Sequence, residues 1–361
     1  MIPISVCIIG KNEEKNIERC LAPLTPYGFE IIYVDTGSTD RTKELAAKYT
    51  NKIYDFEWVN DFSAARNFSL KKASHNYVLV VDCDEFLTEI DLEGIEQAVN
   101  EHPRGIGMVL RINHCESNGK MTVSPDRVER LFHKRYYHYN YTIHEQVCDI
   151  NTNSTYCERY DIPLTLDHIG YVGNEEEKRL KAERNNALLF KEIEKRPNDP
   201  YFYFQVGQSY NLIEDYENAY IYYKKASSLP LNTEELWVQF MATAFINSMT
   251  HTGRSEEALE IFERVYNDYA NNADFYCSMG NIYLNLENPQ PLKAMMEYVK
   301  ASQCADAREE GANTFIPFYN MGLVNEMLGN IPAAINFYQK SAAYDYPLAL
   351  QRLAILGGMN P

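Results

Sequence analysis

The stretch NYVLVVDCDEF, residues 76–86, decides how the chain is interpreted. It begins with a run of strand-forming apolar residues and ends with three acids, Asp82, Asp84 and Glu85. A strand with so many consecutive apolar residues is typical of a sheet that is covered on both faces. The acids therefore stand at the tip of a buried strand, where proteins of this type place their binding sites.

The residues on either side of this stretch alternate between short apolar runs and charged, helical runs. Strands are predicted over residues 4–10, 30–35, 52–58 and 76–82, and helices over residues 14–24, 38–49 and 63–73. The second helix is expected to open with Ser38 or Thr39 as its cap. This alternation predicts an α/β domain with a mainly parallel sheet covered on both sides. Asp35 and Asp82 both fall at strand ends.

The composition excludes several classes of protein. The 361 residues include 34 Lys and Arg against 51 Asp and Glu, a net charge of −17, which argues against a sequence-independent grip on nucleic acid. The eight cysteines show no zinc-site spacing and are expected to be reduced thiols. The opening MIPISVCIIG is typical of a first strand rather than a signal peptide, and no run is apolar enough to span a membrane. We therefore expect a cytoplasmic protein.

The second half of the chain has a repeated helical pattern. Residues 197–230 match the tetratricopeptide pattern, and Gly322, Ala334 and Tyr338 repeat its anchors 115 residues after Gly207, Ala219 and Tyr223. The anchor alanines 219, 258, 294 and 334 are 39, 36 and 40 residues apart, so four irregular repeats are predicted. The anchors are expected to pack helix against helix, which leaves the concave surface for binding or self-association.

The acids of the opening stretch are suited to a divalent cation. Mg²⁺ and Mn²⁺ take oxygen ligands and are commonly shared between a carboxylate or two and the phosphates of a substrate. An Asp-x-Asp pair also occurs by chance at the cap of a loop, so the pair alone does not decide between a metal site and a turn. Its neighbours in the sequence favour the metal site.

Three further segments point to a nucleotide. VDTGSTDRT, residues 34–42, places Asp35 and a Gly-Ser-Thr turn after a strand, which suits hydrogen bonding to a nucleoside. NDFSAARN, residues 60–67, places Arg66 in the first turns of a helix, where it suits a diphosphate or a base edge. Lys11 follows the first strand directly. Each residue has an ordinary structural explanation, but a nucleotide site accounts for all of them.

In the order and spacing of these blocks the sequence resembles the inverting family 2 glycosyltransferases with the GT-A fold. The resemblance covers roughly residues 3–175 and rests on SVCIIGKNEEKNIERCL, EIIYVDTGSTDRT, DFSAARN and VVDCDEF. It implies that Asp35 contacts the base of a nucleotide sugar, with Lys11 and Arg66 nearby on the nucleotide. It further implies that Asp84 binds Mn²⁺ or Mg²⁺ directly, and that Asp82 lies on the ribose or on a water of the metal.

Two later motifs carry the rest of the expected site. RLFHKRYYHYNYTIHEQV, residues 130–147, resembles the His-Glu pair of a bacterial subgroup, and a base is needed to take the proton of the acceptor in a single displacement. Glu145 is the first candidate and His144 the second, unless both only shape the floor of the site. In LDHIGYVGN, residues 166–174, His168 is a candidate third ligand of the metal or diphosphate. The ED and QxxRW motifs of better-known members are missing, and Glu85, His114, His133 and His138 are expected to have structural or ordinary polar roles.

The predicted layout is a catalytic domain over residues 1–175, a connecting helix over 176–196 and an all-α repeat domain over 197–361. It is similar to that of sublancin-type peptide S-glycosyltransferases, which implies a UDP-sugar donor and a peptide or protein acceptor held by the repeats. A cell-surface polysaccharide or lipid-linked acceptor, a non-catalytic repeat scaffold and a nucleotidyltransferase remain alternatives. The acidic GKNEEKN segment argues against the last of these. A second copy of the chain, bound through the repeats, is a further candidate partner.

Overall fold

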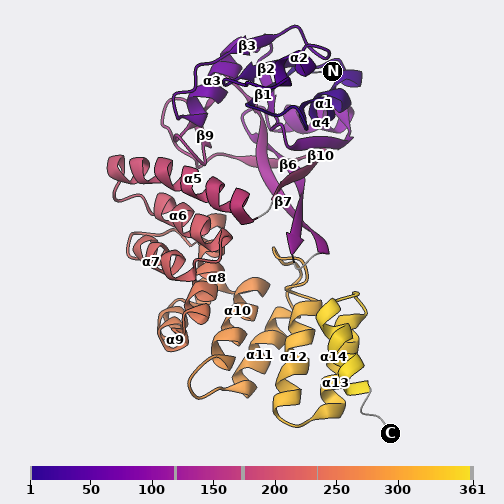
Figure 1. Ribbon diagram of the computed structural model, residues 1–361, viewed down its shortest axis with the longest axis vertical. Coiled ribbons are helices and arrows are strands. Elements are labelled where there is room, and N and C mark those ends of the chain that lie inside the picture. The colour runs from indigo at the N-terminus through magenta and orange to yellow at the C-terminus, as the bar shows by residue number, and fades with distance from the viewer. Residues whose placement is uncertain (1, 118–119, 172–174, 234, 358–361) are drawn as a thin grey trace. The chain divides into compact units, whose positions relative to one another are not determined.

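The computed structural model describes residues 2–117, 120–171, 175–233 and 235–357 (Figure 1). The chain divides into two compact units, Met1–Glu177 and Lys178–Pro361, each with its own core. We call them unit 1 and unit 2 and describe each by itself.

Unit 1 is built on an eight-stranded sheet in the order β3-β2-β1-β4-β7-β6-β10-β5, with a separate β8-β9 ribbon. The strands are β1 (Ile4–Gly10), β2 (Glu30–Asp35), β3 (Ile53–Asp55), β4 (Tyr77–Val80), β5 (Glu85–Ile90), β6 (Ile106–Ser117), β7 (Lys120–His133), β8 (Tyr137–Asn140), β9 (Gln146–Asp149) and β10 (Arg159–Tyr171). The helices are α1 (Ile17–Leu21), the 3₁₀ helix η1 (Ala22–Tyr27), α2 (Thr42–Ala46), α3 (Phe62–Lys72) and α4 (Leu92–Glu101).

The first half of the sheet is parallel and aligns three strand ends. In β1, Gly10 lies opposite Asp35 of β2 and Cys7 lies opposite Val80 of β4, so the acids of the opening stretch follow at the same edge. One core forms against α1, η1, α2 and α4, and a second forms with α3 and the β8-β9 ribbon. This covering confirms the predicted α/β class, and it places the candidate site at the carboxyl edge of the sheet.

The second half of the sheet was not foreseen from the alternating pattern. Four strand pairings are parallel, but β4 with β7, β6 with β7, and β5 with β10 are antiparallel. β6 and β7 follow one another directly without a crossover helix, and they form a long antiparallel ladder. These strands extend the sheet on the far side of β4, next to the acids.

Two predicted helices begin or end elsewhere. The first is α-helical only over Ile17–Leu21 and continues as the 3₁₀ helix η1, because Pro23 and Pro26 lack a backbone N–H. The prediction that Ser38 or Thr39 caps the second helix is wrong. That helix begins at Thr42, and the segment before it is held to the loop after β1 instead.

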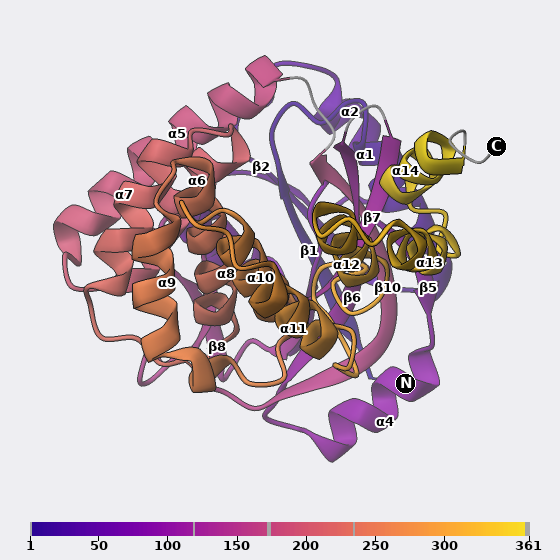
Figure 2. The ribbon, with the colours of Figure 1, turned by 90° about the horizontal axis from the view of Figure 1, so that it is seen from below.

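Unit 2 is all-helical and follows the predicted repeats (Figures 1 and 2). After α5 (Glu175–Lys195) come the pairs α6 (Pro200–Leu212) with α7 (Tyr216–Ser227), α8 (Leu236–His251) with α9 (Ser255–Arg264), α10 (Ala273–Leu284) with α11 (Pro291–Ala301), and α12 (Phe315–Met327) with α13 (Ile331–Ala342), then α14 (Pro347–Gly357). The four anchor alanines, Ala219, Ala258, Ala294 and Ala334, are fully buried. They pack helices together as predicted.

None of the helices in the described part of the chain has the length and apolar character required to cross a bilayer.

Candidate active site

The loops after β1 and β2 are fastened to each other. The Asn12 side-chain oxygen accepts a hydrogen bond from the backbone N–H of Thr39 at 2.8 Å, and the Asn12 N–H donates to Ser38 Oγ at 2.9 Å. The Glu13 N–H donates to Thr42 Oγ1 at 2.7 Å. Lys11 lies in this fastened loop and is exposed. At the carboxyl edge of the sheet, the two loops are therefore held together, and the charged side chain of Lys11 lies at their surface.

Asp35 has one side-chain oxygen that accepts hydrogen bonds and one that does not. The residue is only 2% exposed, and its Oδ2 accepts the N–H groups of Gly37 and Ser38 at 3.0 and 2.9 Å. Gly37 has φ +105°, which favours glycine and lets the turn close over the carboxylate. Oδ1 is buried, and none of the residues that the structure describes donates to it. Buried polar atoms are normally paired, so this oxygen is suited to a donor supplied by a ligand.

Asp82 is held by two buried arginines. Arg66 Nη2 lies 2.8 Å from Oδ1 and Arg130 Nη2 lies 2.8 Å from Oδ2, so each carboxylate oxygen has its own guanidinium. Burial opposes ionisation, but Arg66 and Arg130 hold the pKa of Asp82 below its usual value. Asp82 is therefore an ionised and immobilised carboxylate.

Glu85 lies under Asp82 and has the structural role expected of it. The side chain is fully buried and pairs with Arg130 and, at 3.3 Å, with Arg111. Its second oxygen accepts the backbone N–H of Asp82 at 3.1 Å. A fully buried carboxylate persists only with such partners, so Glu85 fixes the turn between β4 and β5.

Asp84 faces a histidine rather than an arginine. Its Oδ2 lies 3.5 Å from His168 Nε2, and its side chain is 34% exposed. His168 Nδ1 lies 2.7 Å from the side-chain oxygen of Asn113, and this contact holds the ring with Nε2 on the side of Asp84. A carboxylate and an imidazole nitrogen that lie together at a strand end are residue types suited to a divalent cation.

The described residues supply no group of three His, Cys, Asp or Glu side chains close enough to hold a metal. Two protein ligands suffice for Mg²⁺ or Mn²⁺ when substrate phosphates and water complete the coordination. The Asp84 and His168 pair therefore fits a cation that binds together with its substrate.

The candidate base is connected to Asp82 through one arginine. Arg66 Nε donates to Glu145 Oε1 at 2.5 Å, while its Nη2 pairs with Asp82. The loop that carries Glu145 is pinned to α3, since its Thr142 carbonyl accepts the Phe62 N–H at 2.8 Å. His144 has φ +50°, an uncommon conformation that turns the chain at this point.

The structure thus brings the predicted residues into two groups. Arg66, Asp82 and Glu145 form one charged network, and Asp84 lies with His168. Residues 172–174 of the motif that contains His168 lie outside the described residues.

The sequence did not single out Arg111, Asn113 or Arg130. Arg130 opens the RLF segment, but its contact with Asp82 joins residues 48 positions apart and has no local signal. His114, expected to be an ordinary polar residue, lies 3.4 Å from Asp167.

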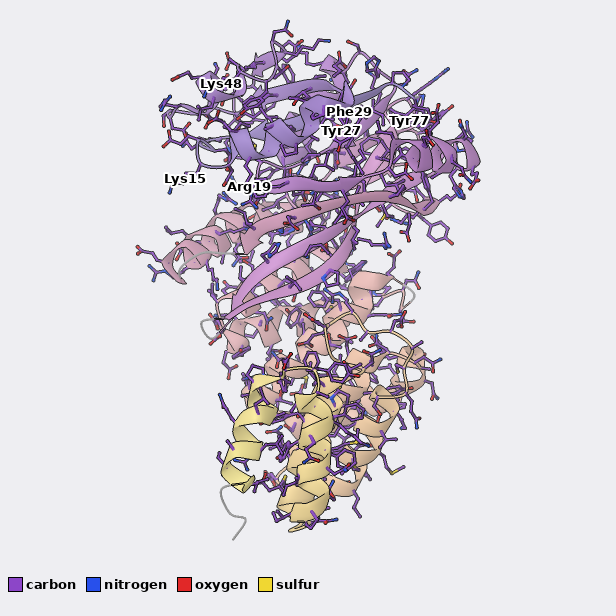
Figure 3. All side chains as sticks on the ribbon, turned by 90° about the vertical axis from the view of Figure 1, so that its right-hand side faces the viewer. Lys15, Arg19, Tyr27, Phe29, Lys48 and Tyr77 are labelled. Atoms are coloured by element: carbon purple, nitrogen blue, oxygen red, sulfur yellow. The ribbon has the colours of Figure 1, made fainter. Side chains whose placement is uncertain are left out.

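One hollow of unit 1 lies away from these residues. Figure 3 shows Tyr27, Phe29 and Tyr77 at the amino edge of the sheet, while Lys15 and Arg19 lie toward the carboxyl edge. A hollow of about 110 Å³ at the amino edge is lined by Tyr27, Phe29 and His75 among others, and it contains no predicted site residue.

Comparison with known proteins finds a family match within each unit. Residues 5–160 match the family "Glycosyl transferase family 2", and residues 200–233 match a tetratricopeptide repeat. A TPR repeat-containing protein of Synechococcus elongatus is 29% identical over 57% of this chain and 52% of its own length. The SPbeta prophage-derived glycosyltransferase SunS of Bacillus subtilis is 28% identical over 62% of this chain and 53% of its own length.

The chain spans about half the length of these curated relatives. Among solved structures, Staphylococcus aureus TarS aligns with 86% of this chain and 55% of its own, at 13% identity and a TM-score of 0.37. By the family matches, residues 5–160 are similar to family 2 glycosyltransferases and residues 200–233 to a tetratricopeptide repeat.

Proposed function

We propose that this protein transfers a sugar, with inversion, from a nucleotide sugar to an acceptor in a reaction that requires a divalent cation. The observation that carries the proposal is the pairing of Asp84 with His168 Nε2 at the same sheet edge as Asp35, whose Oδ1 has no partner among the described residues. A metal ligand set and a buried acceptor at one sheet edge suit the two ends of a nucleoside diphosphate.

Asp35 is proposed to recognise the base. Its Oδ1 is an acceptor fixed by the two hydrogen bonds on Oδ2, and a uracil ring offers an N–H to such an oxygen. Lys11 is proposed to contact the diphosphate as an exposed point charge. These contacts favour a UDP-sugar as donor.

Asp84 and His168 are proposed to hold Mn²⁺ or Mg²⁺. When bound, the cation offsets the negative charge that develops on the departing diphosphate. Asp82 is proposed to lie on the ribose or on a metal-bound water, a role for which Arg66 and Arg130 keep it ionised and fixed.

Glu145 is proposed as the base, with His144 as the second candidate. The acceptor atom forms a bond to the anomeric carbon as the bond from that carbon to the diphosphate oxygen breaks. The bonding electrons leave with the diphosphate, and the proton of the acceptor moves to the Glu145 carboxylate.

A peptide or protein side chain is the proposed acceptor, because tetratricopeptide repeats generally hold peptides. A polymer acceptor is the alternative, since a Staphylococcus aureus relative that is 31% identical over 28% of this chain is named a poly(ribitol-phosphate) beta-N-acetylglucosaminyltransferase. The cytoplasm is the proposed location.

Titration calorimetry tests the donor half of the proposal. UDP-glucose, UDP-N-acetylglucosamine, UDP-galactose and GDP-mannose are each titrated into the protein with Mn²⁺ and with a chelator. Micromolar binding of one UDP-sugar that disappears with the chelator is expected. Binding of none of them by folded protein would overturn the proposal in favour of the scaffold alternative.

A further inference from the structure

Arg66 is committed to two acids of the protein. Its side chain is 8% exposed, and two of its three nitrogens are committed to protein acids, Nη2 to Asp82 at 2.8 Å and Nε to Glu145 at 2.5 Å. Nη1 is buried and meets no acceptor among the described residues. A guanidinium in this state acts mainly on the acids that it joins.

The surroundings hold Arg66 in place from several directions. Arg130 grips the other oxygen of Asp82 at 2.8 Å, so Asp82 cannot follow Arg66 if that side chain moves. The ring of Tyr139 lies 5.4 Å from Arg66 Cζ, within cation–π range. The neighbouring Asn67 side chain exchanges two hydrogen bonds with the backbone of Tyr139, at 2.8 and 2.9 Å. These contacts hold α3 against β8 and thereby fix the backbone position from which the Arg66 side chain extends.

The loop that carries Glu145 depends on the same helix. Ser63 Oγ donates to the Tyr141 carbonyl at 2.5 Å, and the Phe62 N–H donates to the Thr142 carbonyl at 2.8 Å. The first turn of α3 therefore sets the loop backbone, and Arg66, one turn later, sets the carboxylate. Without the arginine, the partly buried carboxylates of Asp82 and Glu145 would be neighbouring like charges, which is unfavourable.

We infer that Arg66 is a positioning residue that acts through Glu145, by clamping this carboxylate against the immobile Asp82 so that the base is fixed relative to the metal-binding turn. The inference rests on the proposed function, because it presupposes that Glu145 takes the proton of the acceptor. It assigns the arginine to the base rather than to the nucleotide. A displacement of about 1 Å in such a group costs on the order of 100-fold in rate.

Lysine is the informative substitution. It keeps the positive charge between Asp82 and Glu145, but a single ammonium cannot reproduce the planar fork that serves both acids at once. Arg66→Lys is therefore expected to fold and to leave Glu145 imperfectly placed. Arg41→Lys is the matched control, because Arg41 pairs with Glu44 on the surface and is 65% exposed.

A double-mutant cycle with Arg66→Lys and Glu145→Gln tests the inference. The measurements are the rate of UDP release from the UDP-sugar that binds in the titration, with water as acceptor, and the Kd of that sugar with Mn²⁺. Arg66→Lys is expected to lower the rate about 10- to 100-fold with Kd changed less than about threefold. In protein that already carries Glu145→Gln, Arg66→Lys should lower the rate by less than about a further threefold. The reason is that both substitutions disable the same base.

Two results would overturn the role of Arg66. The rate losses would multiply in the double variant if the arginine acted independently of Glu145. If Arg66→Lys weakened donor binding by about 10-fold or more, Arg66 would instead be a residue that contacts the nucleotide. Wild-type protein that neither binds nor hydrolyses any UDP-sugar would refute the proposed function itself. This result differs from a failure of the Arg66 inference, which would be seen only in the variants.

If Arg66→Lys does not fold, Ser63→Ala provides the same test without changing a charge. It removes the hydrogen bond that holds the Glu145 loop to α3. A lower rate with unchanged donor Kd supports the positioning role, whereas an unchanged rate or a weakened Kd contradicts it.

Discussion

The two units differ in the interior contacts that characterise them. Unit 1 has a network of charged groups that occurs once, with Asp82 and Glu85 held by Arg66, Arg111 and Arg130. Unit 2 repeats one uncharged contact, in which a helix glycine receives the ring of a tyrosine from its partner helix. The pairs are Gly207 with Tyr223, Gly280 with Tyr298, and Gly322 with Tyr338.

The difference teaches which contacts tolerate change. A buried ion pair that loses one partner leaves a charge without compensation, so the cost is large and the geometry is unique. A glycine and ring contact depends on space alone, so its cost grows with the volume added. Charge therefore suits a site that must hold one arrangement, and repeated shape suits a scaffold.

The largest effect is expected where the charged arrangement meets the cation. Asp84→Ala removes the carboxylate that faces His168, and transfer of sugar should fall about 1000-fold or more even with saturating Mn²⁺. The initial rate of UDP release from the bound donor checks this. Asp55→Ala is the control, because the Asp55 side chain is 75% exposed in an ion pair with Lys43. A wild-type rate for Asp84→Ala would remove the metal role from this residue.

Glu145→Gln is expected to have the next largest effect. The amide keeps the shape of the side chain but cannot take a proton, so kcat should fall about 100-fold while the donor Kd stays within a factor of about two. Steady-state rates and calorimetry with the same UDP-sugar separate the two quantities. Equal losses in kcat and in donor binding would instead give Glu145 a structural role.

The sequence predicted the repeated contacts better than the unique ones. Gly207 and Tyr223 recur at a constant offset in Gly322 and Tyr338, so a periodic pattern reveals them. Arg66 and Glu145, in contrast, meet across 79 residues, and no periodicity connects them.

The strands show the same division. β1 and β2 were predicted to the residue from their apolar runs and their places before helices. Arg130 was missed because β7 joins the sheet antiparallel to β4, an arrangement that alternating strands and helices do not announce. The sequence indicated the carboxyl edge as the site, but only the packing of β7 reveals that Asp82 is shared between two arginines.

Unit 1 is expected to lose stability at a higher pH than unit 2 when the solution is acidified. In unit 1 burial raises the pKa of Glu30, but hydrogen bonds from Lys52, Ser5 and Ser74 prevail and lower it to about 2, and the pKa of Asp82 is also lowered. Because these folded-state values lie below the unfolded ones, the stability that they supply is complete above about pH 5 and is lost as the pH falls toward 2. For Glu30 alone the loss is on the order of 3 kcal/mol. In unit 2 burial raises the pKa of Asp199, so acid favours its folded state.

The two tryptophans report on the units separately, since Trp58 lies in unit 1 and Trp237 packs on Phe204 in unit 2. With Trp237→Phe the remaining fluorescence should show unit 1 unfolding between about pH 5 and 2. With Trp58→Phe the signal of unit 2 should change at a lower pH. Coincident transitions would contradict the contrast, and Glu30→Gln should flatten the acid response of unit 1 alone.

The smallest expected effect tests the shape-based half of the comparison. A Cβ added to Gly280 would lie 2.4 Å from a ring atom of Tyr298, so Gly280→Ala must push the ring and separate α10 from α11. Overpacking of this kind costs about 1–3 kcal/mol, measured as the free energy of unfolding of the Trp58→Phe protein in urea. Gly357→Ala is the matched control, because an added Cβ there meets nothing within 4 Å. Donor binding should be unchanged in both variants, since the tyrosine contact belongs to the scaffold. If Gly280→Ala instead weakened UDP-sugar binding while unit 2 kept its stability, the repeats would be part of the donor site. The glycine and tyrosine contacts would then serve binding as well as stability, and the contrast with the charged network of unit 1 would fail.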